Sequence, residues 1–389
     1  MKKIYILGGG IAGLEAAIAL RQDGFSVTVV SERDFVFVHP ISIWIPTGEK
    51  SFEDVCIPLN ELAKVHKFDV LVDEVVGINA AANNFTLRQN GVIGYDYLII
   101  ALGSEKIAYE GAAHTLSICG KPEDSLKIKE KIDSMIATGG GKLTVGFAGN
   151  PIDDTSGVRD GAAFEFMFNI HNMLKKRGIR DKFQLTFFAP MQNPGDRLGE
   201  KAVKELNRFF SKHKIITKFG TPISCFEQNA VVFEDGTKID SDFIMFVPGR
   251  LGHELMKTTD LPLSDAGFVK INPYCQVQGY DNVFAIGDVT SLEGPDWRVK
   301  QGHVAEVMAR NAAFNIFSIE NHSDARRSYI EQLNLIFMLD MGDSASLVYR
   351  DSKRDFLLPI PVVGHWLKKG WGRYYRLSRL CKIPRLPGA

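Results

Sequence analysis

Gly8-Gly9-Gly10-Ile11-Ala12-Gly13 lies between an apolar run, residues 3–7, and a segment rich in Ala, Leu and Ile, residues 11–22. The apolar run predicts a buried strand, and the segment after the glycines predicts a helix. Gly8 permits a tight turn, Gly10 lets the backbone approach a pyrophosphate, and Gly13 lets the helix pack closely on the sheet. The free N–H groups of such a helix start attract phosphate. The stretch therefore predicts a Rossmann fold whose loop, including Ile11 and Ala12, binds a dinucleotide.

A second strand is predicted at residues 26–31 and completes a βαβ unit. Glu32 follows this strand, where a carboxylate can hydrogen-bond the diol of a ribose. The alternative is an ordinary glycine-rich turn with a surface glutamate, but the complete βαβ context favours a nucleotide site. This unit alone does not distinguish NAD from FAD.

The composition is typical of a globular protein. The 389 residues suffice for two domains, with 45% hydrophobic and 24% charged residues. The net charge of zero argues against general attraction to nucleic acid. Five scattered cysteines without a CxxC pair fit a reducing compartment, and His39, His171 and His303 have no metal-ligand spacing, so we predict no metal site. No apolar stretch approaches the ~20 residues that span a bilayer.

Two later segments resemble the FAD motifs of flavoproteins that contain two dinucleotide-binding domains. They are YDYLIIALGS at residues 95–104 and NVFAIGDV at residues 282–289, and Leu102 replaces the usual threonine of the first motif. The resemblance implies that Asp288 contacts the ribityl chain, as a carboxylate accepts hydrogen bonds from hydroxyls. It implies that the backbone of Val75 meets the adenine. The other cofactor-binding residues expected from these motifs are Arg33, Pro40, Ala101, Leu102, Gly103 and Gly287.

We therefore expect an α/β protein with two Rossmann-like domains. The FAD-binding domain would comprise residues 1–110 and 246–320, the second, NAD-type domain residues 111–245, and a C-terminal membrane and quinone region residues 321–389. In the second domain, strands are predicted at 142–148 and 183–189, helices at 161–177 and 201–213, and a hairpin turn at 234–237. The stretch 146–154 lacks a third glycine and ends in two aspartates that would repel a pyrophosphate, so it does not indicate NADH binding.

The whole chain resembles the sulfide:quinone oxidoreductase group, which is related to flavocytochrome c sulfide dehydrogenase and to type II NADH dehydrogenases. Residues 37–44, 161–166 and 300–306 carry this resemblance. In that group two cysteines carry sulfur beside the flavin, since a thiolate attacks sulfur and passes electrons on. Here Arg159 and Phe337 stand at those two positions. The resemblance thus implies FAD and a quinone, but not sulfide oxidation by the usual route.

Three residues are candidate catalytic groups. Cys119 resembles a third cysteine of some members, although a buried cysteine is more often a small hydrophobe. Glu165 lies among phenylalanines, where a raised pKa would let it relay a proton to reduced quinone; the alternative is a glutamate favoured by the helix dipole. Lys300 resembles a lysine at the flavin pyrimidine edge, where a cation stabilises the anionic reduced ring, and it is otherwise a solvated lysine.

After Asp355 the chain has no acidic residue. A helix is predicted between Pro361 and Pro384, with a mostly apolar spacing at 367, 371, 374, 378 and 381 and with basic residues largely on other faces. Such a helix lies in a membrane interface, with its cations on anionic lipid. A helix packed on the protein body and a nucleic-acid patch are the alternatives. The basic residues are Lys368, Lys369, Arg373, Arg376, Arg379, Lys382 and Arg385.

The sequence thus predicts a peripheral flavoprotein at the cytoplasmic face of the cell membrane that passes electrons through FAD to quinone. The small-molecule donor, sulfide or NADH, stays undecided, and so does a homo-oligomeric state. A type II NADH:quinone reductase is one alternative. The other is a membrane-bound flavoprotein without catalytic activity that acts as a redox module.

Overall fold

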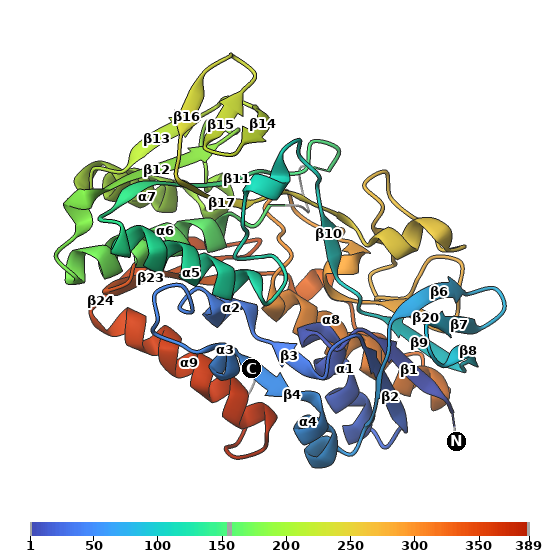
Figure 1. Cartoon of the computed structure of the whole chain (residues 1–389). Coiled ribbons are helices and arrows are strands. Elements are labelled where there is room, and N and C mark those ends of the chain that lie inside the picture. Colours follow the sequence, from blue (N-terminus) through green and yellow to red (C-terminus); the bar gives the residue numbers. More distant parts are fainter. Residues whose placement is uncertain (1, 154–157, 387–389) are drawn as a thin grey trace.

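The structure is a computed structural model that describes residues 2–153 and 158–386 (Figure 1). A five-stranded parallel sheet has the order β20-β9-β1-β2-β5. Its short strands are almost entirely apolar, as expected for a parallel sheet that is covered on both faces. They are β1 (Ile4–Leu7), β2 (Val27–Ser31), β5 (Asp69–Val72), β9 (Tyr97–Ile100) and β20 (Val283–Ala285).

Helices α1 (Ile11–Gln22) and α8 (Gly302–Glu320) pack side by side against this sheet (Figure 1). The predicted βαβ unit is therefore confirmed, and α1 has the predicted bounds. Shorter elements surround the sheet: β3 (Phe35–Phe37), α2 (His39–Ser42), α3 (Phe52–Val55), β4 (Cys56–Pro58), α4 (Leu59–His66), β6 (Val75–Asn79), β7 (Asn84–Leu87), β8 (Gly91–Gly94), β19 (Val269–Lys270) and β21 (Thr290–Ser291).

A second parallel sheet has the order β13-β12-β11-β17. Its strands are β11 (Gly141–Phe147), β12 (Phe183–Ala189), β13 (Ile216–Phe219) and β17 (Phe243–Val247), and its helices are α5 (Asp124–Ala137), α6 (Asp160–Lys176) and α7 (Glu200–Lys212). The two predicted strands and two predicted helices are confirmed to within one residue. The predicted hairpin is also present, between β15 (Ala230–Phe233) and β16 (Lys238–Asp240), with β14 (Ile223–Glu227) beside β15.

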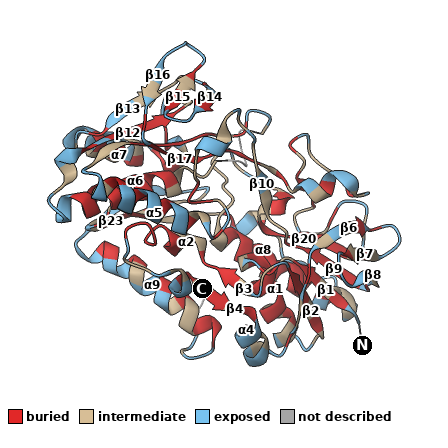
Figure 2. Ribbon diagram, in the orientation of Figure 1, coloured by how far each residue is buried: buried red, intermediate tan, exposed pale blue. Residues whose placement is uncertain are grey.

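Phenylalanines fix α6 on the second sheet. The Phe164 ring stacks on Phe187 of β12 with centroids 5.0 Å apart, and it meets the Phe147 ring of β11 at 5.6 Å. Figure 2 shows α6 and the strands beneath it as largely buried. The antiparallel strands β10 (Ser104–Lys106) and β18 (Arg250–Gly252) pair in the segments that connect the two parallel sheets. The α/β class is thus confirmed, while the domain bounds stay a prediction.

The C-terminal region forms an antiparallel sheet and one long helix. The strands are β22 (Leu335–Asp340), β23 (Ser344–Arg350) and β24 (Asp355–Pro361), and the helix is α9 (Val363–Arg379). The helix predicted after Pro361 is therefore present, and it packs on β22 and β23. The expectation that its basic residues face lipid is wrong for Lys368 and Arg379, which are buried and paired with carboxylates. In residues 2–153 and 158–386, no helix is long and apolar enough to cross a bilayer.

Candidate active site

Four strands of the first sheet end in the residues that the sequence singles out. Gly8 follows β1, Glu32 follows β2, Ala101 follows β9, and Gly287 comes two residues after the end of β20. Because these strands are parallel, all four ends lie at one edge of the sheet. Ligands of open α/β sheets bind outside this carboxyl edge.

Close packing requires a glycine at two positions of the first loop, Gly8 and Gly13, and leaves open space at a third, Gly10. Gly8 has φ +115°, and a Cβ there would overlap the carbonyl oxygen of Ala101. A Cβ at Gly13 would overlap the carbonyl oxygen of Gly8. At Gly10, by contrast, no atom lies within 4 Å of an added Cβ. Gly10 caps α1 without a side-chain hydrogen bond, and the first turn has no acidic residue, so the helix start can take an anion.

Asp288 and Lys300 lie together beside this loop. A Cβ at Gly287 would be 3.1 Å from the Cβ of Ala12, which places Asp288 next to the loop. The Nζ of Lys300 donates to the carbonyl oxygen of Asp288 at 3.0 Å, and the Asp288 carboxylate pairs with Arg159. Burial lowers the pKa of Lys300 well below its usual value; Asp153 opposes this shift and Arg159 adds to it.

Glu32, Arg33, Pro40 and Val75 lie around the same edge. The Glu32 carboxylate is exposed and forms an ion pair of 2.9 Å with Arg33. Pro40 is in the first turn of α2, and Val75 begins β6. Their predicted contacts with the cofactor stay predictions.

Several buried polar atoms at this edge have no hydrogen-bond partner among the described residues. They are Nδ1 of His39, Oγ of Ser104 and Oε1 of Gln301, which directly adjoin Pro40, Gly103 and Lys300 in the chain. Buried polar groups nearly always have a partner in a complete structure. Together with the space beside Gly10, these atoms fit a polar ligand of dinucleotide type.

Glu165 belongs to a second cluster, where α6 meets β22 and α9. Its Oε1 accepts a hydrogen bond from the Asp340 backbone at 2.8 Å and pairs with the Nζ of Lys368. Burial raises the pKa of Glu165 to about 7, against the attraction of Lys368 and with the repulsion of Asp340. Glu165 can therefore hold or release a proton near neutral pH.

Asp340 is fully buried and connects this cluster to the surface. Its carboxylate accepts hydrogen bonds from Nε1 of Trp44 at 3.0 Å and Nδ2 of Asn169 at 3.1 Å, and it lies 2.8 Å from Nδ1 of His365. The other ring nitrogen of His365, Nε2, lies 3.4 Å from the carboxylate of Glu49, which is partly exposed. Burial lowers the pKa of His365, but its hydrogen bonds to Asp340 and Glu49 outweigh burial and raise the pKa to about 9.

The model of the family described as "Pyridine nucleotide-disulphide oxidoreductase" matches residues 2–309. The chain belongs to this family. Membership makes the protein an oxidoreductase, as the sequence predicts, and it accounts for the glycine loop and the strand ends described above.

Two similar proteins carry names of quinone-reducing enzymes. The sulfide-quinone reductase of Aquifex aeolicus is 27% identical over 399 residues, which cover 96% of this chain and 90% of that protein. The type II NADH:quinone oxidoreductase of Staphylococcus aureus is 25% identical over 315 residues, 75% of each chain. The solved structure of sulfide:quinone oxidoreductase from Aquifex aeolicus matches with a TM-score of 0.88 at 24% identity, covering 98% of this chain and 92% of that one. The NDH2 structure from Plasmodium falciparum with NADH has a TM-score of 0.77 at 14% identity, covering 98% of each chain.

Arg159 and Phe337, which stand where the resemblance implies sulfur-carrying cysteines, lie close together in this pyridine nucleotide-disulphide oxidoreductase. Arg159 caps α6, and the Phe337 ring lies against Gly161 in its first turn, 2.7 Å from where a Cβ would be. Cys119 is buried, and its carbonyl oxygen accepts a hydrogen bond of 2.6 Å from Nη2 of Arg250. The Glu165 carboxylate contacts α9 and β22, and within the described residues no hydrogen bond or ion pair joins it to Cys119 or Lys300.

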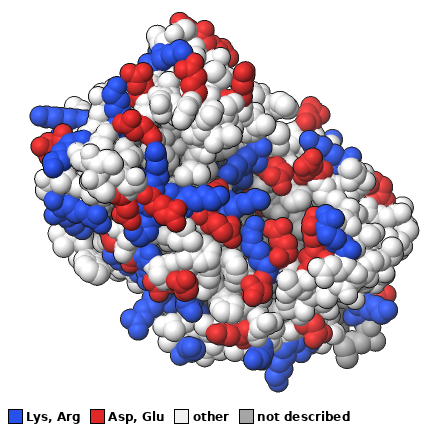
Figure 3. All heavy atoms as spheres, in the orientation of Figure 1, with Lys and Arg blue, Asp and Glu red and all other residues white. Residues whose placement is uncertain are grey.

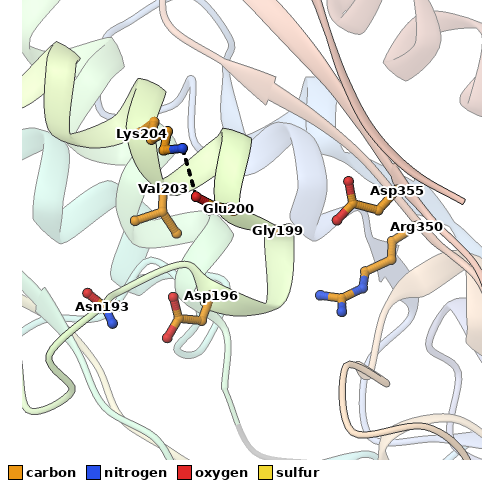
Figure 4. Close-up of a pocket in the computed structure, with 8 residues that line it drawn as sticks. All are labelled: Asn193, Asp196, Gly199, Glu200, Val203, Lys204, Arg350 and Asp355. Atoms are coloured by element: carbon orange, nitrogen blue, oxygen red, sulfur yellow. Dashed lines mark ion pairs between the residues drawn. The ribbon is translucent and has the colours of Figure 1, made fainter.

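A polar pocket of about 480 Å³ lies apart from all these residues, between the start of α7 and strands β23 and β24 (Figure 4). None of the predicted site residues lines it, so it is not the active-site candidate. Its lining residues are Asn193, Asp196, Gly199, Glu200, Val203, Lys204, Arg350 and Asp355. Within residues 2–153 and 158–386, no group of three His, Cys, Asp or Glu side chains could hold a metal ion.

The sequence patterns did not indicate the partners of Glu165 or the burial of Arg250. Asp340 is an acidic residue at the end of the apolar strand β22, which is a detectable signal of a buried polar site. Arg250 carries no such signal, because its neighbours come from strand pairing with β10.

Proposed function

We propose that this chain binds FAD and passes electrons from a small-molecule donor to a quinone at a membrane surface. The observation that carries the proposal is the meeting of four strand ends, with Gly8, Glu32, Ala101 and Asp288, at one edge of a parallel sheet. A dinucleotide that crosses this edge would find a helix start for its pyrophosphate and carboxylates for its hydroxyls. FAD is the dinucleotide that the later two motifs and the family support.

When bound, FAD would accept two electrons from the donor and deliver them to the quinone. The turn from Gly8 to Gly13 would hold the pyrophosphate, and Glu32 and Asp288 would hold hydroxyl groups. Lys300 would place a positive charge beside the cofactor. Its low pKa and its bond to the Asp288 carbonyl are consistent with a cation that an anionic partner would stabilise.

Glu165 would hold a proton for the quinone. Its carboxyl is buried, and its pKa of about 7 makes both protonation states accessible. Lys368 and the Asp340 backbone orient this carboxyl. Reduction of a quinone to a quinol takes up two protons, so a titratable group in an apolar setting is a suitable donor.

A membrane surface for the acceptor is supported by the outer face of the C-terminal region. Large apolar side chains are exposed there, and the exposed Arg373 flanks them on α9, while Lys369 is paired with Glu49. Exposed apolar patches of this kind on an amphipathic helix bind lipid interfaces, and cations add attraction to anionic lipid. We propose the cytoplasmic face of the cell membrane. The exposed side chains are Phe356, Leu358, Val362, Val363, Trp366, Leu367 and Trp371.

The donor does not follow from the relatives, one of which is named for sulfide and another for NADH. Arg159 and Phe337 cannot carry sulfur, so sulfide oxidation by paired thiolates is not proposed. A second phosphate loop would require the turn after β11 to lead directly into a helix. Residues 148–153, which follow β11, do not do so.

The test is anaerobic reduction of the purified protein. We expect a yellow protein that releases FAD when denatured, and reduced flavin that a quinone analogue reoxidises. Mixing with sulfide and, separately, with NADH identifies a donor by bleaching of the flavin absorption. Rapid bleaching by NADH alone would favour a type II NADH:quinone reductase. A colourless protein without FAD, or reduced flavin that quinone does not reoxidise, would contradict the proposal.

A further inference from the structure

Four cations gather between the two parallel sheets, on the side of the predicted cofactor edge. Arg159 caps α6 and reaches the carboxylate of Asp288, and Lys300 bonds the carbonyl of the same residue. Arg250 begins β18, which pairs with β10 directly after Gly103. Lys106 ends β10 opposite Arg250. On the face in Figure 3, several Lys and Arg side chains lie near the middle of the molecule, with Asp and Glu side chains among them.

Arg250 has no counter-ion among the described residues. The residue is more than nine-tenths buried, and its guanidinium donates to two backbone carbonyls, of Cys119 at 2.6 Å and of Ser104 at 3.4 Å. Its Nε has no hydrogen-bond partner in the part of the chain that the structure describes. A buried charge without a partner of opposite sign is costly, and a guanidinium binds oxyanions and carboxylates with high geometric specificity.

No carboxylate of the described residues forms an ion pair with Arg250. Burial lowers the pKa of Arg250 to about 10 and repulsion from Arg159 adds to the shift, while the attraction of Cys119 and Glu105 opposes it. His39 faces the same group: burial lowers its pKa to about 3, and Arg159, Arg250 and Arg33 lower it further, so it stays neutral. Asp288 is the carboxylate paired with Arg159, and Asp124 lies 3.8 Å from Lys106. Arg250 is thus left as the cation that a small anion would neutralise.

We propose that Arg159 and Arg250 bind a small anion with a carboxylate or oxyanion group, and that the electron donor of this protein is such an anion. The anion would be oxidised by the loss of two electrons and two protons, the electrons would reduce the bound FAD, and the protons would pass to the reduced cofactor and to solvent. The inference rests on the proposed function, because it identifies the donor site with the space beside Asp288 and Lys300. It gives a reason for an arginine at position 159, where a thiol would serve a different donor chemistry.

The test uses the FAD-loaded protein and follows the flavin absorption spectrum during titration with sodium acetate or sodium sulfate at fixed ionic strength. Acetamide, which has the shape of acetate without its charge, is the neutral control. We expect acetate and sulfate to shift the spectrum with saturation, and acetamide to have no effect. Arg250→Gln and Arg159→Gln should each weaken anion binding at least about tenfold. The anion affinity of Arg250→Lys should lie between those of the original protein and Arg250→Gln. Arg208→Gln, on the exposed side of α7, should bind the anion as the original protein does.

Each other result overturns the inference in a distinguishable way. A yellow protein whose spectrum no anion shifts would overturn the inference and leave the proposed function standing. Anion binding by Arg159→Gln that is as tight as in the original protein would also overturn the inference. This variant serves as the second test if Arg250→Gln does not fold. Loss of FAD itself from the folded variants would show that these arginines hold the cofactor and not a donor. A colourless original protein would overturn the proposed function together with the inference.

Discussion

The Nζ of Lys368 on α9 pairs with Oε1 of Glu165 in α6, although 203 residues separate them in the chain. Both side chains are buried, so neither charge is compensated by water. Removing one partner of such a pair usually costs more stability than the pair itself provides, because the other charge stays buried. The pair therefore fixes the C-terminal helix against α6 and also controls the protonation of Glu165.

Replacing Lys368 by methionine should raise the pKa of the Glu165 carboxyl. Burial already raises the pKa of this carboxyl to about 7, and Lys368 is the main group that opposes the shift. Without the ammonium the pKa should rise by about one unit or more. Reoxidation of reduced flavin by a quinone analogue, measured by stopped flow from pH 5 to 9, should lose rate above about pH 7 in the original protein and at higher pH in K368M.

The companion variant Glu165→Gln cannot give up a proton and should reoxidise on the order of 100-fold more slowly, without a titration near pH 7. Lys201→Met, an exposed lysine on α7, is the control and should keep the original pH profile. A pH profile that is the same in all four proteins would remove Glu165 from the proton path.

The cofactor edge of the first sheet and the cluster around Glu165 differ in how far the sequence predicts them. The glycine loop and the strand ends follow from local patterns: a turn that needs Gly8, and apolar strands that stop at Glu32 or Asp288. Strand order then brings these ends together, because the strands are parallel. The neighbourhood of Glu165 depends on Asp340 and Lys368, which are distant in the chain. Helical periodicity assigned Lys368 to the lipid side, but it does not reveal that a buried carboxylate attracts this lysine inwards.

The contacts of His365 should make stability depend on pH above neutrality. Its folded pKa of about 9 is above the ordinary value of 6.5, so its contribution is complete below about pH 6.5 and is lost as pH rises through 9. The shift corresponds to ~3 kcal/mol of unfolding free energy. Urea unfolding at pH 6.5 and 9.5 should show this loss in the original protein, and a much smaller one in His365→Gln. An equal loss in both proteins would contradict the assignment. His322→Gln, on the exposed loop after α8, is the control.

Gly10→Ala should remove the cofactor without harming the fold. Its φ of −81° suits alanine and no atom lies within 4 Å of the added Cβ, so the protein itself accommodates the methyl group. A pyrophosphate against the backbone would meet that methyl, and FAD affinity should fall about tenfold or more. The FAD content after purification and the thermal midpoint of the apoprotein measure the two effects.

Two other glycines serve as comparisons for Gly10. Gly370→Ala on the exposed face of α9, also with open space around its Cβ, should keep FAD. Gly13→Ala should lower the thermal midpoint, because its Cβ overlaps the backbone of Gly8. If Gly10→Ala retains the full FAD content, the pyrophosphate does not pass beside this residue.

The apolar face of α9 should be what binds the protein to lipid. Trp366, Leu367 and Trp371 expose 66%, 49% and 39% of their surface, and burial of one such side chain is worth ~1.5–3 kcal/mol. The triple serine variant should therefore bind vesicles of phosphatidylcholine and phosphatidylglycerol at least about tenfold more weakly in a sedimentation assay.

A matched control replaces three side chains of similar exposure elsewhere by serine: Val92 at 68%, Ile216 at 51% and Tyr274 at 38%. Because the exposed Arg373 adds an electrostatic part, high salt should weaken binding of the original protein without abolishing it. Equal vesicle binding by the two triple variants would show that α9 does not face the membrane.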